Sequence, residues 1–325
     1  MVRVRFAPSP TGTLHVGNAL SAVANRRIGD WLLLRLDDTD AARNVPGGEE
    51  AIVEDLRWLG ITWDDGPVRQ SERAERHVAA AREAQLPQRF DGVMLWRDDG
   101  SPTFHLATVV DDIDFGITHV VRGNDHRPNE PLHRRLFEAL GATPPEFVHH
   151  GLILGPDGRK LAKRAPGGSV ASLREEGIPA EAVRAYLEEL GLPRHDVHLD
   201  LTRVRRLSTQ TLAALSDEEL AARVGVPVSV APVLRGARDL AEARAYAELV
   251  LQPTPAEVDS PETFARAREL VEAGLDPKAI VREVKAVGGD LKALRVALTG
   301  QERGPELAAV IAALPRDELL SRLER

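Results

Sequence analysis

Residues 5–18 read Arg5-Phe6-Ala7-Pro8-Ser9-Pro10-Thr11-Gly12-Thr13-Leu14-His15-Val16-Gly17-Asn18, and this stretch decides the fold. The apolar run 2–6 predicts a strand, and a helix is expected to begin near Leu14. Pro8, Pro10 and Gly12 punctuate the loop between them. A strand, a tight turn and a helix start favour anion binding, because unpaired backbone N–H groups and the helix dipole attract negative charge. We therefore predict a nucleoside triphosphate site.

Two further features support this interpretation. His15 would add a hydrogen-bond donor in the first turn of the helix, and Gly17 would let a flat ring approach the backbone. Far downstream, Lys160 and Lys163 follow the turn Gly155-Pro156-Asp157-Gly158. Two ammonium groups on a mobile loop suit a reaction in which charge builds up on a leaving phosphate. Without the upstream motif, these lysines would fit a solvated basic turn better.

The composition narrows the class of protein. A chain of 325 residues is long enough for two or three domains with a substantial core. It contains no cysteine, which excludes disulfides and thiolate metal sites, and its adjacent pair His149-His150 would point to opposite faces of a strand. No zinc site and no membrane span are expected, and the predicted location is the cytoplasm. The net charge of −8 argues against a strongly basic RNA-binding surface, although Arg203, Arg205 and Arg206 form a local basic group.

The first half of the chain alternates short apolar runs with helical patterns, which predicts an α/β fold with a parallel sheet covered by helices. The expected strands are 2–6, 32–36, 93–96, 105–110 and 118–121, and the expected helices are 49–59, 77–84 and 131–140. Residues 147–154 form an apolar run that leads to the lysine loop.

From about Ser172 the pattern becomes helical. Pro179 opens a helix over 180–190 that Gly191 ends, and Ser216-Asp217-Glu218-Glu219 is a capping box whose helix stops at Gly225. Three more starts and three more stops follow: Ser260-Pro261, Asp276-Pro277 and Asp290, and Gly274, Gly288 and Gly300. Gln252-Pro253-Thr254-Pro255 is predicted to be a turn or linker. The C-terminal region is therefore expected to be an α-helical bundle.

Taken together, the motifs resemble those of class I aminoacyl-tRNA synthetases, in the glutamyl/glutaminyl branch. Residues 8–18 are similar to the first signature, and Lys160-Leu161-Ala162-Lys163-Arg164 to the second. Five further motifs lie between them in the order that glutamyl-tRNA synthetases use: 34–40, 69–73, 102–107, 109–112 and 116–123. A single motif would be a weak hypothesis, whereas seven in order are specific. The resemblance implies a Rossmann-like catalytic domain that forms an aminoacyl-adenylate from ATP.

The resemblance also implies which residues form the site. ATP would be bound by Pro8, Thr11, Gly12, His15, Gly17, Asn18, Asp125, Lys160 and Lys163. The amino acid would be bound by Arg5, Ala7, Ser9, Asp37, Phe104 and Arg122. Catalysis would rest on His15, Lys160 and Lys163, with Mg²⁺ held mainly by the phosphate oxygens of ATP. Because two arginines suit two carboxylates, glutamate or a close analogue is the expected substrate.

Several residues depart from the family pattern. Asp37 stands where a glutamate is usual, and Phe104 stands where a tyrosine is usual, so the pocket lacks a methylene and a hydroxyl. Ala162 replaces the serine between the two lysines, which we interpret as tuning because both lysines remain. Residues 123–126 also differ from the usual acidic pair and aromatic residue. A site that loses a polar partner usually changes its ligand preference, so these departures bear on which amino acid is bound and not on adenylation.

The family normally inserts a sizeable domain for the tRNA acceptor end between the motifs 69–73 and 102–107. Here the insertion is reduced to about 74–101, enough for one helix, a turn and a hairpin. The expected domains are a catalytic domain over 1–171, a stem-contact-like helical segment over 172–215, and a shortened anticodon-binding region over 216–325. The end of the chain, 294–307, resembles the far end of that region.

Three hypotheses about function follow. A compact synthetase, expected to be a monomer, would still charge tRNA. A paralogue would instead pass the activated amino acid to a small amine, a thiol or a carrier protein. A non-catalytic binding relative is the least favoured hypothesis, because His15 and both lysines are present. The missing insertion and the acidic balance favour the second hypothesis, whereas the retained C-terminal ending favours the first.

Overall fold

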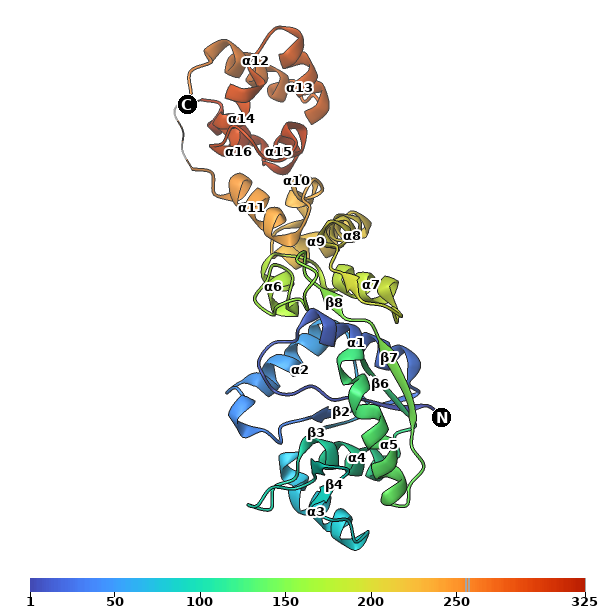
Figure 1. Ribbon diagram of the computed structural model, residues 1–325. Helices are drawn as coiled ribbons and strands as arrows, with labels where there is room; N and C mark the ends of the chain where they lie inside the picture. The colour runs from blue at the N-terminus through green and yellow to red at the C-terminus, as the bar shows by residue number, and fades with distance from the viewer. Residues whose placement is uncertain (255, 257, 325) are drawn as a thin grey trace. The chain divides into compact units, whose positions relative to one another are not determined.

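The computed structural model describes residues 1–254, 256 and 258–324 (Figure 1), and these form two compact units along the chain. The first unit comprises Met1–Arg174 and Val183–Leu201. The second comprises Glu175–Ala182 and the described residues from Thr202 onward. Among the described residues, no helix is both long enough and apolar enough to span a membrane.

Parallel strands lie at the centre of the first unit (Figure 1). They are β1 (Arg3–Phe6), β2 (Trp31–Leu36), β3 (Asp65–Arg69), β6 (His119–Gly123) and β7 (Glu146–His150). β2 pairs with both β1 and β3, whereas β6 pairs with β7. β6 starts beside the start of β1, where the Thr118 amide donates to the Arg3 carbonyl oxygen at 2.9 Å. The predicted α/β fold is confirmed.

The chain proceeds from β1 through β2 to β3, and then returns to the other side of β1 with β6 and β7. In open parallel sheets, a crevice opens beyond the carboxyl ends of the strands where the order reverses in this way. α1 (Val16–Ile28) connects β1 to β2 and packs on β1 and β6 through buried apolar residues that include Val16, Leu20 and Val23. The strand-turn-helix predicted from residues 2–18 is therefore present.

The remaining elements of this unit agree with most of the expected boundaries. They are α2 (Gly48–Trp58), α3 (Ala74–Glu83), the hairpin β4 (Arg89–Phe90) and β5 (Val93–Met94), α4 (Phe104–Asp114), α5 (Glu130–Ala139), β8 (Ile153–Leu154), α6 (Val170–Glu175), most of α7 (Ala180–Leu190) and β9 (Val197–His198). Short 3-10 turns lie at Ala41–Arg43, Ser71–Arg73 and Asn124–Asn129. The segment 74–101 contains the single helix and the hairpin that the sequence predicts.

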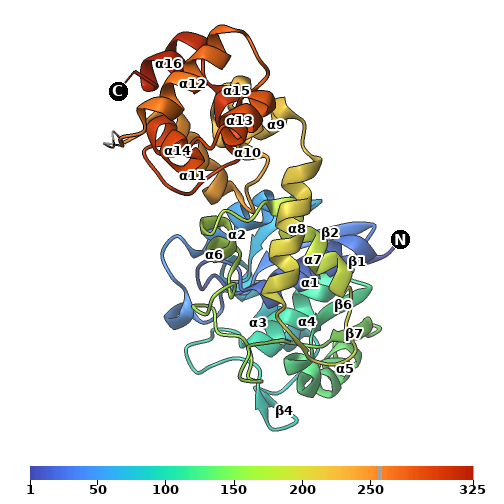
Figure 2. The ribbon, with the colours of Figure 1, turned by 90° about the horizontal axis from the view of Figure 1, so that it is seen from above.

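The prediction of a strand over 105–110 is wrong, because these residues lie inside α4. Leu106, Val109 and Val110 recur at the i, i+3, i+4 spacing of one helical face. They are buried in an apolar cluster that they share with residues of α3 and α5. The ribbon shows these three helices in the same part of the unit (Figure 2). A short apolar run does not by itself distinguish a buried helix from a buried strand, and here the helical period decides.

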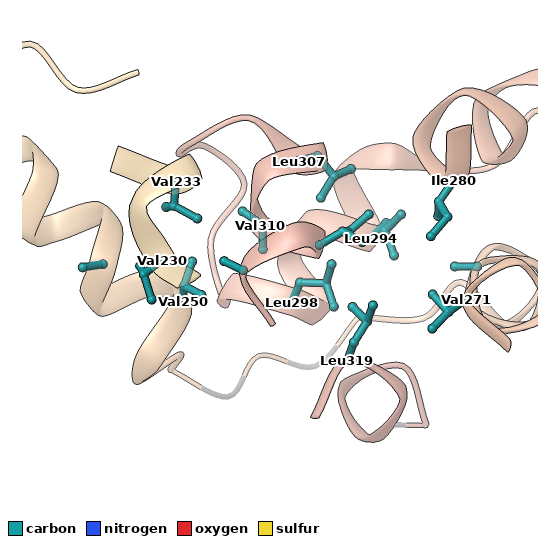
Figure 3. Packing of buried hydrophobic residues seen from close by; sticks show 14 of the residues in the cluster. Val230, Val233, Val250, Val271, Ile280, Leu294, Leu298, Leu307, Val310 and Leu319 are labelled. Carbon is teal, nitrogen blue, oxygen red and sulfur yellow. The ribbon is translucent and has the colours of Figure 1, made fainter. Parts of the chain in front are cut away.

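The second unit is helical, as predicted. Its helices are α8 (Leu201–Ala214), α9 (Asp217–Val224), α10 (Ala231–Leu234), α11 (Leu240–Leu251), α12 (Pro261–Glu272), α13 (Pro277–Ala286), α14 (Leu291–Thr299), α15 (Leu307–Ala313) and α16 (Arg316–Arg322), with a 3-10 turn at Val228–Val230. Their apolar side chains converge on one core, in which Leu294, Leu298 and Val310 lie together (Figure 3). Of the predicted turn at 252–255, residues 252–254 follow the end of α11, and Pro255 lies outside the described residues.

The capping box at Ser216 is confirmed. The Ser216 hydroxyl accepts from the Glu219 amide at 3.1 Å, and a Glu219 carboxylate oxygen accepts from the Ser216 amide at 2.8 Å. Gly225 ends α9 with φ of 82°, a left-handed conformation that glycine adopts without steric penalty.

Replacing the cap should destabilise this unit measurably. We expect Ser216→Ala to lower the free energy of unfolding by about 1 kcal/mol, because it leaves an α9 backbone donor without its partner. Urea unfolding followed by far-UV circular dichroism measures the change. Ser216→Asp keeps a capping acceptor and is the matched control; an equal loss in both variants would contradict the capping role.

Candidate active site

A cleft of about 640 Å³ opens beyond the carboxyl ends of β1 and β6, where the strand order reverses. Of the residues predicted to form the site, it is lined by Arg5, Ala7, Pro8, Ser9, Thr11, His15, Gly17, Asn18, Asp37, Phe104, Arg122, Asp125 and Lys160. Only Gly12 and Lys163 among the predicted residues are not part of the lining. Both are next to Thr11, which lines the cleft: Gly12 follows it in the chain, and Lys163 Nζ donates to its carbonyl oxygen at 2.8 Å.

His15 is the N-cap of α1 and contacts the lysine loop. Its Nδ1 accepts from the Gly17 amide at 2.9 Å, so in the neutral ring Nε2 carries the proton and donates to the Leu161 carbonyl oxygen at 2.6 Å. Burial lowers the pKa of His15, and the charges of Lys160 and Lys163 lower it further. The neutral imidazole therefore joins the two signatures, although 146 residues separate them in sequence.

The start of α1 differs from the prediction in one respect. Unpaired N–H groups were expected there, but the Val16 amide donates to the Gly168 carbonyl oxygen, and the Asn18 amide donates to the His15 carbonyl oxygen. The Gly17 amide is taken by the His15 ring. These amides find partners within the protein because the chain after the lysine loop packs against the helix start, a contact between distant segments.

Both predicted lysines are held by hydrogen bonds to nearby loops. Lys163 Nζ donates to the Thr11 carbonyl oxygen at 2.8 Å, and Lys160 Nζ lies 2.6 Å from an Asp125 carboxylate oxygen. Burial lowers the pKa of Lys163, and the negative charge of Asp55 opposes that effect. The structure thus brings His15 and the lysine loop together at one end of the cleft, where their polar groups contact protein atoms.

Two buried arginines share carboxylates, and one of them, Arg5, lines the cleft. Arg35 is fully buried, and it contacts Asp112 at 2.7 Å and both oxygens of Asp37 at 2.7 and 3.3 Å. Arg5 lies 3.4 Å from Asp112. Asp37, predicted to meet the substrate ammonium, is therefore already paired with Arg35. Burial raises the pKa of Asp37 despite that pairing.

Arg122 differs from Arg5 and Arg35 because its hydrogen-bond partners are histidines. Its Nε donates to His149 Nε2 at 3.2 Å, and its Nη1 lies 3.5 Å from His133 Nδ1. Burial, with the positive charge of Arg5, lowers the pKa of Arg122 to about 10, so it remains a cation near neutral pH. Its Nη2 is buried and has no hydrogen-bond partner among the described residues. An unsatisfied guanidinium nitrogen on a cleft wall is a site for an anionic ligand.

The sequence interpretation missed several residues of this cleft. Thr108 lines it, and its buried hydroxyl has no partner within the part of the chain that the structure describes. His105 and His126 also line it. His133 is not part of the lining, and its Nδ1 lies 3.5 Å from Arg122 Nη1. The missed signal was the helical period of α4, which places Thr108 one turn after Phe104 and three residues after His105, so that it shares a face with each of them. A strand would have put His105 on the opposite face.

The buried histidine predicts a pH-dependent stability. Burial, together with the charge of Arg122, lowers the pKa of His133 from 6.5 to about 2. Between pH 6 and pH 4 the unfolded chain binds a proton at this residue that the folded protein does not, so the free energy of unfolding falls as the pH falls. We expect His133→Gln to reduce this dependence by about 1.4 kcal/mol per pH unit, measured by urea unfolding between pH 4 and 6. An unchanged slope would mean that His133 protonates in the folded state.

Within the described residues, no group of three or more histidine, cysteine, aspartate or glutamate side chains is arranged to hold a metal ion. Asp125, which lines the cleft, is paired with Lys160.

Comparisons with known proteins agree with this geometry. Residues 1–85 and 82–222 match the model of the class I tRNA synthetase (E and Q) catalytic domain, and residues 281–325 match an anticodon binding domain. Glutamate–tRNA ligase 1 of Rubrobacter xylanophilus is 36% identical over 421 residues, which cover 100% of this chain and 97% of that protein. Glutamate–tRNA ligase of Akkermansia muciniphila is 32% identical over 425 residues, which cover 99% and 98%. The fold and the cleft thus define a class I synthetase.

A solved structure shows the same fold. The glutamate tRNA ligase of Elizabethkingia meningosepticum, in complex with its amino acid, superposes with a TM-score of 0.76 at 24% identity, over 99% of this chain and 98% of that one. The chain belongs to the glutamyl and glutaminyl branch of the class I tRNA synthetases.

The shortened segment is visible in the same comparisons. The two alignments are longer than the 325 residues of this chain, so each relative carries stretches that the chain lacks. The family model matches in two pieces that meet at residues 82–85, inside the segment 74–101. The structure contains only α3 and the short hairpin there.

Proposed function

We propose that this protein activates glutamate with ATP as glutamyl-adenylate and transfers the glutamyl group to tRNA. The observation that carries the proposal is that one cleft contains both an unsatisfied buried arginine, Arg122, and the paired signatures at His15 and Lys160. The whole-chain likeness to glutamate–tRNA ligases and the match to an anticodon binding domain favour tRNA as the acceptor.

The residues at the α1 end of the cleft suit the phosphates of ATP. We assign ATP binding to Pro8, Thr11, Gly12, His15, Gly17, Asn18, Asp125, Lys160 and Lys163. In the resting arrangement the lysines contact Thr11 and Asp125; arriving phosphates would replace those partners with stronger, doubly charged ones. Mg²⁺ would be carried by phosphate oxygens of ATP, since the described residues offer it no cluster of ligands.

The cleft residues around Arg5 and Arg122 suit an acidic amino acid. We assign its binding to Arg5, Ala7, Ser9, Asp37, Phe104 and Arg122. A substrate carboxylate at Arg122 would satisfy its free Nη2, and Asp37 retains lone pairs for the ammonium group while it is paired with Arg35.

The two ends then act on one reaction. The α-carboxylate oxygen of glutamate attacks the α-phosphorus of ATP, the bond from that phosphorus to the bridging oxygen breaks, and pyrophosphate leaves. Lys160 and Lys163 stabilise the charge that develops on the leaving phosphates, and His15, which donates to the Leu161 carbonyl, holds the loop that carries them.

We further assign the catalytic role to residues 1–171, a stem-contact role to 172–215 and an anticodon-binding role to 216–325. The competing hypothesis of a non-tRNA acceptor draws on two observations: the reduction of the segment 74–101 to a helix and a hairpin, and the net charge of −8.

Pyrophosphate exchange tests the activation step. The pure protein, incubated with glutamate, ATP and labelled pyrophosphate, should form labelled ATP; no exchange with or without total tRNA would refute the proposal. Filter binding to total tRNA at increasing salt then tests the acceptor, since phosphate contacts weaken as salt rises. Exchange without any tRNA binding or charging would instead favour a small acceptor, to be identified by mass in RNA-free extract.

A further inference from the structure

Arg122 projects from β6 with 7% of its surface exposed, and its hydrogen bonds fix the state of the rings around it. An arginine nitrogen can only donate, so His149 Nε2 and His133 Nδ1 must both be acceptors. The proton of His133 therefore lies on Nε2, which is 3.1 Å from His105 Nδ1. The proton of His149 lies on Nδ1, which is 3.4 Å from a Glu130 carboxylate oxygen.

Both rings are neutral in this arrangement. Burial, with the charge of Arg122, lowers the pKa of His133 to about 2 and that of His149 to about 4. Three carboxylates lie near Arg122, and each is paired with another cation: Asp112 with Arg5 and Arg35, Glu130 with Arg134, and Asp125 with Lys160. Arg122 thus receives two hydrogen-bond acceptors, and neither of them carries a compensating negative charge.

Arg35 shows the alternative that the fold could have used. Two carboxylates, Asp37 and Asp112, contact it at 2.7 Å and satisfy it both by charge and by hydrogen bonding. An arginine paired in that way holds its orientation but has little remaining attraction for an anionic ligand. Neutral imidazole acceptors orient the guanidinium by hydrogen bonding without neutralising it, so its positive charge remains available to an anionic ligand.

We propose that His133 and His149 are positioning residues that hold Arg122 by neutral acceptors, and that they thereby make the site select an acidic amino acid over its neutral amide. The inference rests on the proposed function, because it takes Arg122 as the group that meets the substrate carboxylate. The preference for a substrate with a charged side chain is thereby assigned to His133 and His149 as well as to Arg122.

The test compares neutral and charged acceptors of the same shape at residue 133. His133→Gln keeps an acceptor oxygen without charge, whereas His133→Glu pairs Arg122 with a carboxylate. We expect His133→Gln to raise the KM for glutamate by less than about fivefold. We expect His133→Glu to raise it on the order of a hundredfold and to remove the preference for glutamate over glutamine, with the KM for ATP changed little. His195→Glu, at an exposed histidine of the same unit, is the control.

His149 provides a second, independent pair of variants. His149→Gln keeps both the acceptor for Arg122 and a donor for Glu130, whereas His149→Leu removes both. We expect the leucine variant to raise the KM for glutamate about tenfold or more with a smaller change in kcat, and the glutamine variant to restore most of the loss. Thermal unfolding of each variant establishes that it is folded.

The outcomes separate the inference from the proposed function. Suppose that the wild-type protein exchanges pyrophosphate with glutamate. The positioning role is then refuted if His133→Glu keeps the wild-type preference for glutamate over glutamine, or if His133→Gln raises the KM for glutamate as much as His133→Glu does. If the wild-type protein shows no exchange, calorimetric binding of glutamate and glutamine to the same variants decides the inference by itself. A wild-type protein that binds neither amino acid overturns both.

Discussion

Lys163→Ala should lower kcat for glutamate-dependent pyrophosphate exchange by about 10²–10³-fold, while the KM for glutamate changes by less than about threefold. The reason is the place of the ammonium group. Lys163 Nζ donates to the Thr11 carbonyl oxygen in the loop before α1, whereas Arg5 and Arg122 contact Asp112 and His149. In the proposed site its charge therefore acts on the phosphates, whose negative charge grows in the transition state, and not on the amino acid.

The measurement is initial-rate exchange at varied glutamate and saturating ATP. Lys285→Ala, at an exposed lysine in α13, is the control and should leave both constants at wild-type values. A loss shared equally between kcat and the KM for glutamate would contradict the assigned role. So would a Lys163→Ala protein as fast as the wild type.

Arg122→Leu should have a comparably large effect of the opposite kind. We expect the KM for glutamate to rise about 10³-fold, because a buried charged partner of the substrate is lost and a bidentate contact cannot form. The KM for ATP should change little, because the hydrogen bonds of Arg122 go to His149 and His133 and not to His15 or the lysine loop. Glutamine should be affected far less than glutamate, since an amide gains little from a cation.

Isothermal calorimetry with glutamate and glutamine, together with exchange kinetics, measures these effects. Arg89→Leu, at an exposed arginine in β4, is the matched control. Arg122→Lys adds a sharper comparison, because it keeps the charge but loses the planar fork and should recover only part of the affinity. Retention of wild-type glutamate affinity in Arg122→Leu would place the substrate carboxylate elsewhere.

Much of the secondary structure could be predicted because its signals are local. The capping box at Ser216 and the stop at Gly225 depend on residues three to nine positions apart, and both are confirmed. The strand-turn-helix around Gly12 follows from turn residues between two apolar runs, and it too is confirmed. The prediction of a strand at 105–110 was wrong, because only the packing of α4 on α3 and α5 distinguishes the helical period from the strand period in this short apolar run.

The sequence by itself determined the strand-turn-helix at its start, the helical character of the C-terminal unit with its cap at Ser216, and the two signatures whose side chains the structure brings to one cleft. Only the tertiary structure decided the states of those groups: Asp37 is paired with Arg35, the first amides of α1 are already satisfied, and Arg122 rests on neutral histidines. The physical reason is that a hydrogen-bond partner, a buried charge and a shifted pKa depend on which distant segments meet. Local propensity carries no information about that meeting.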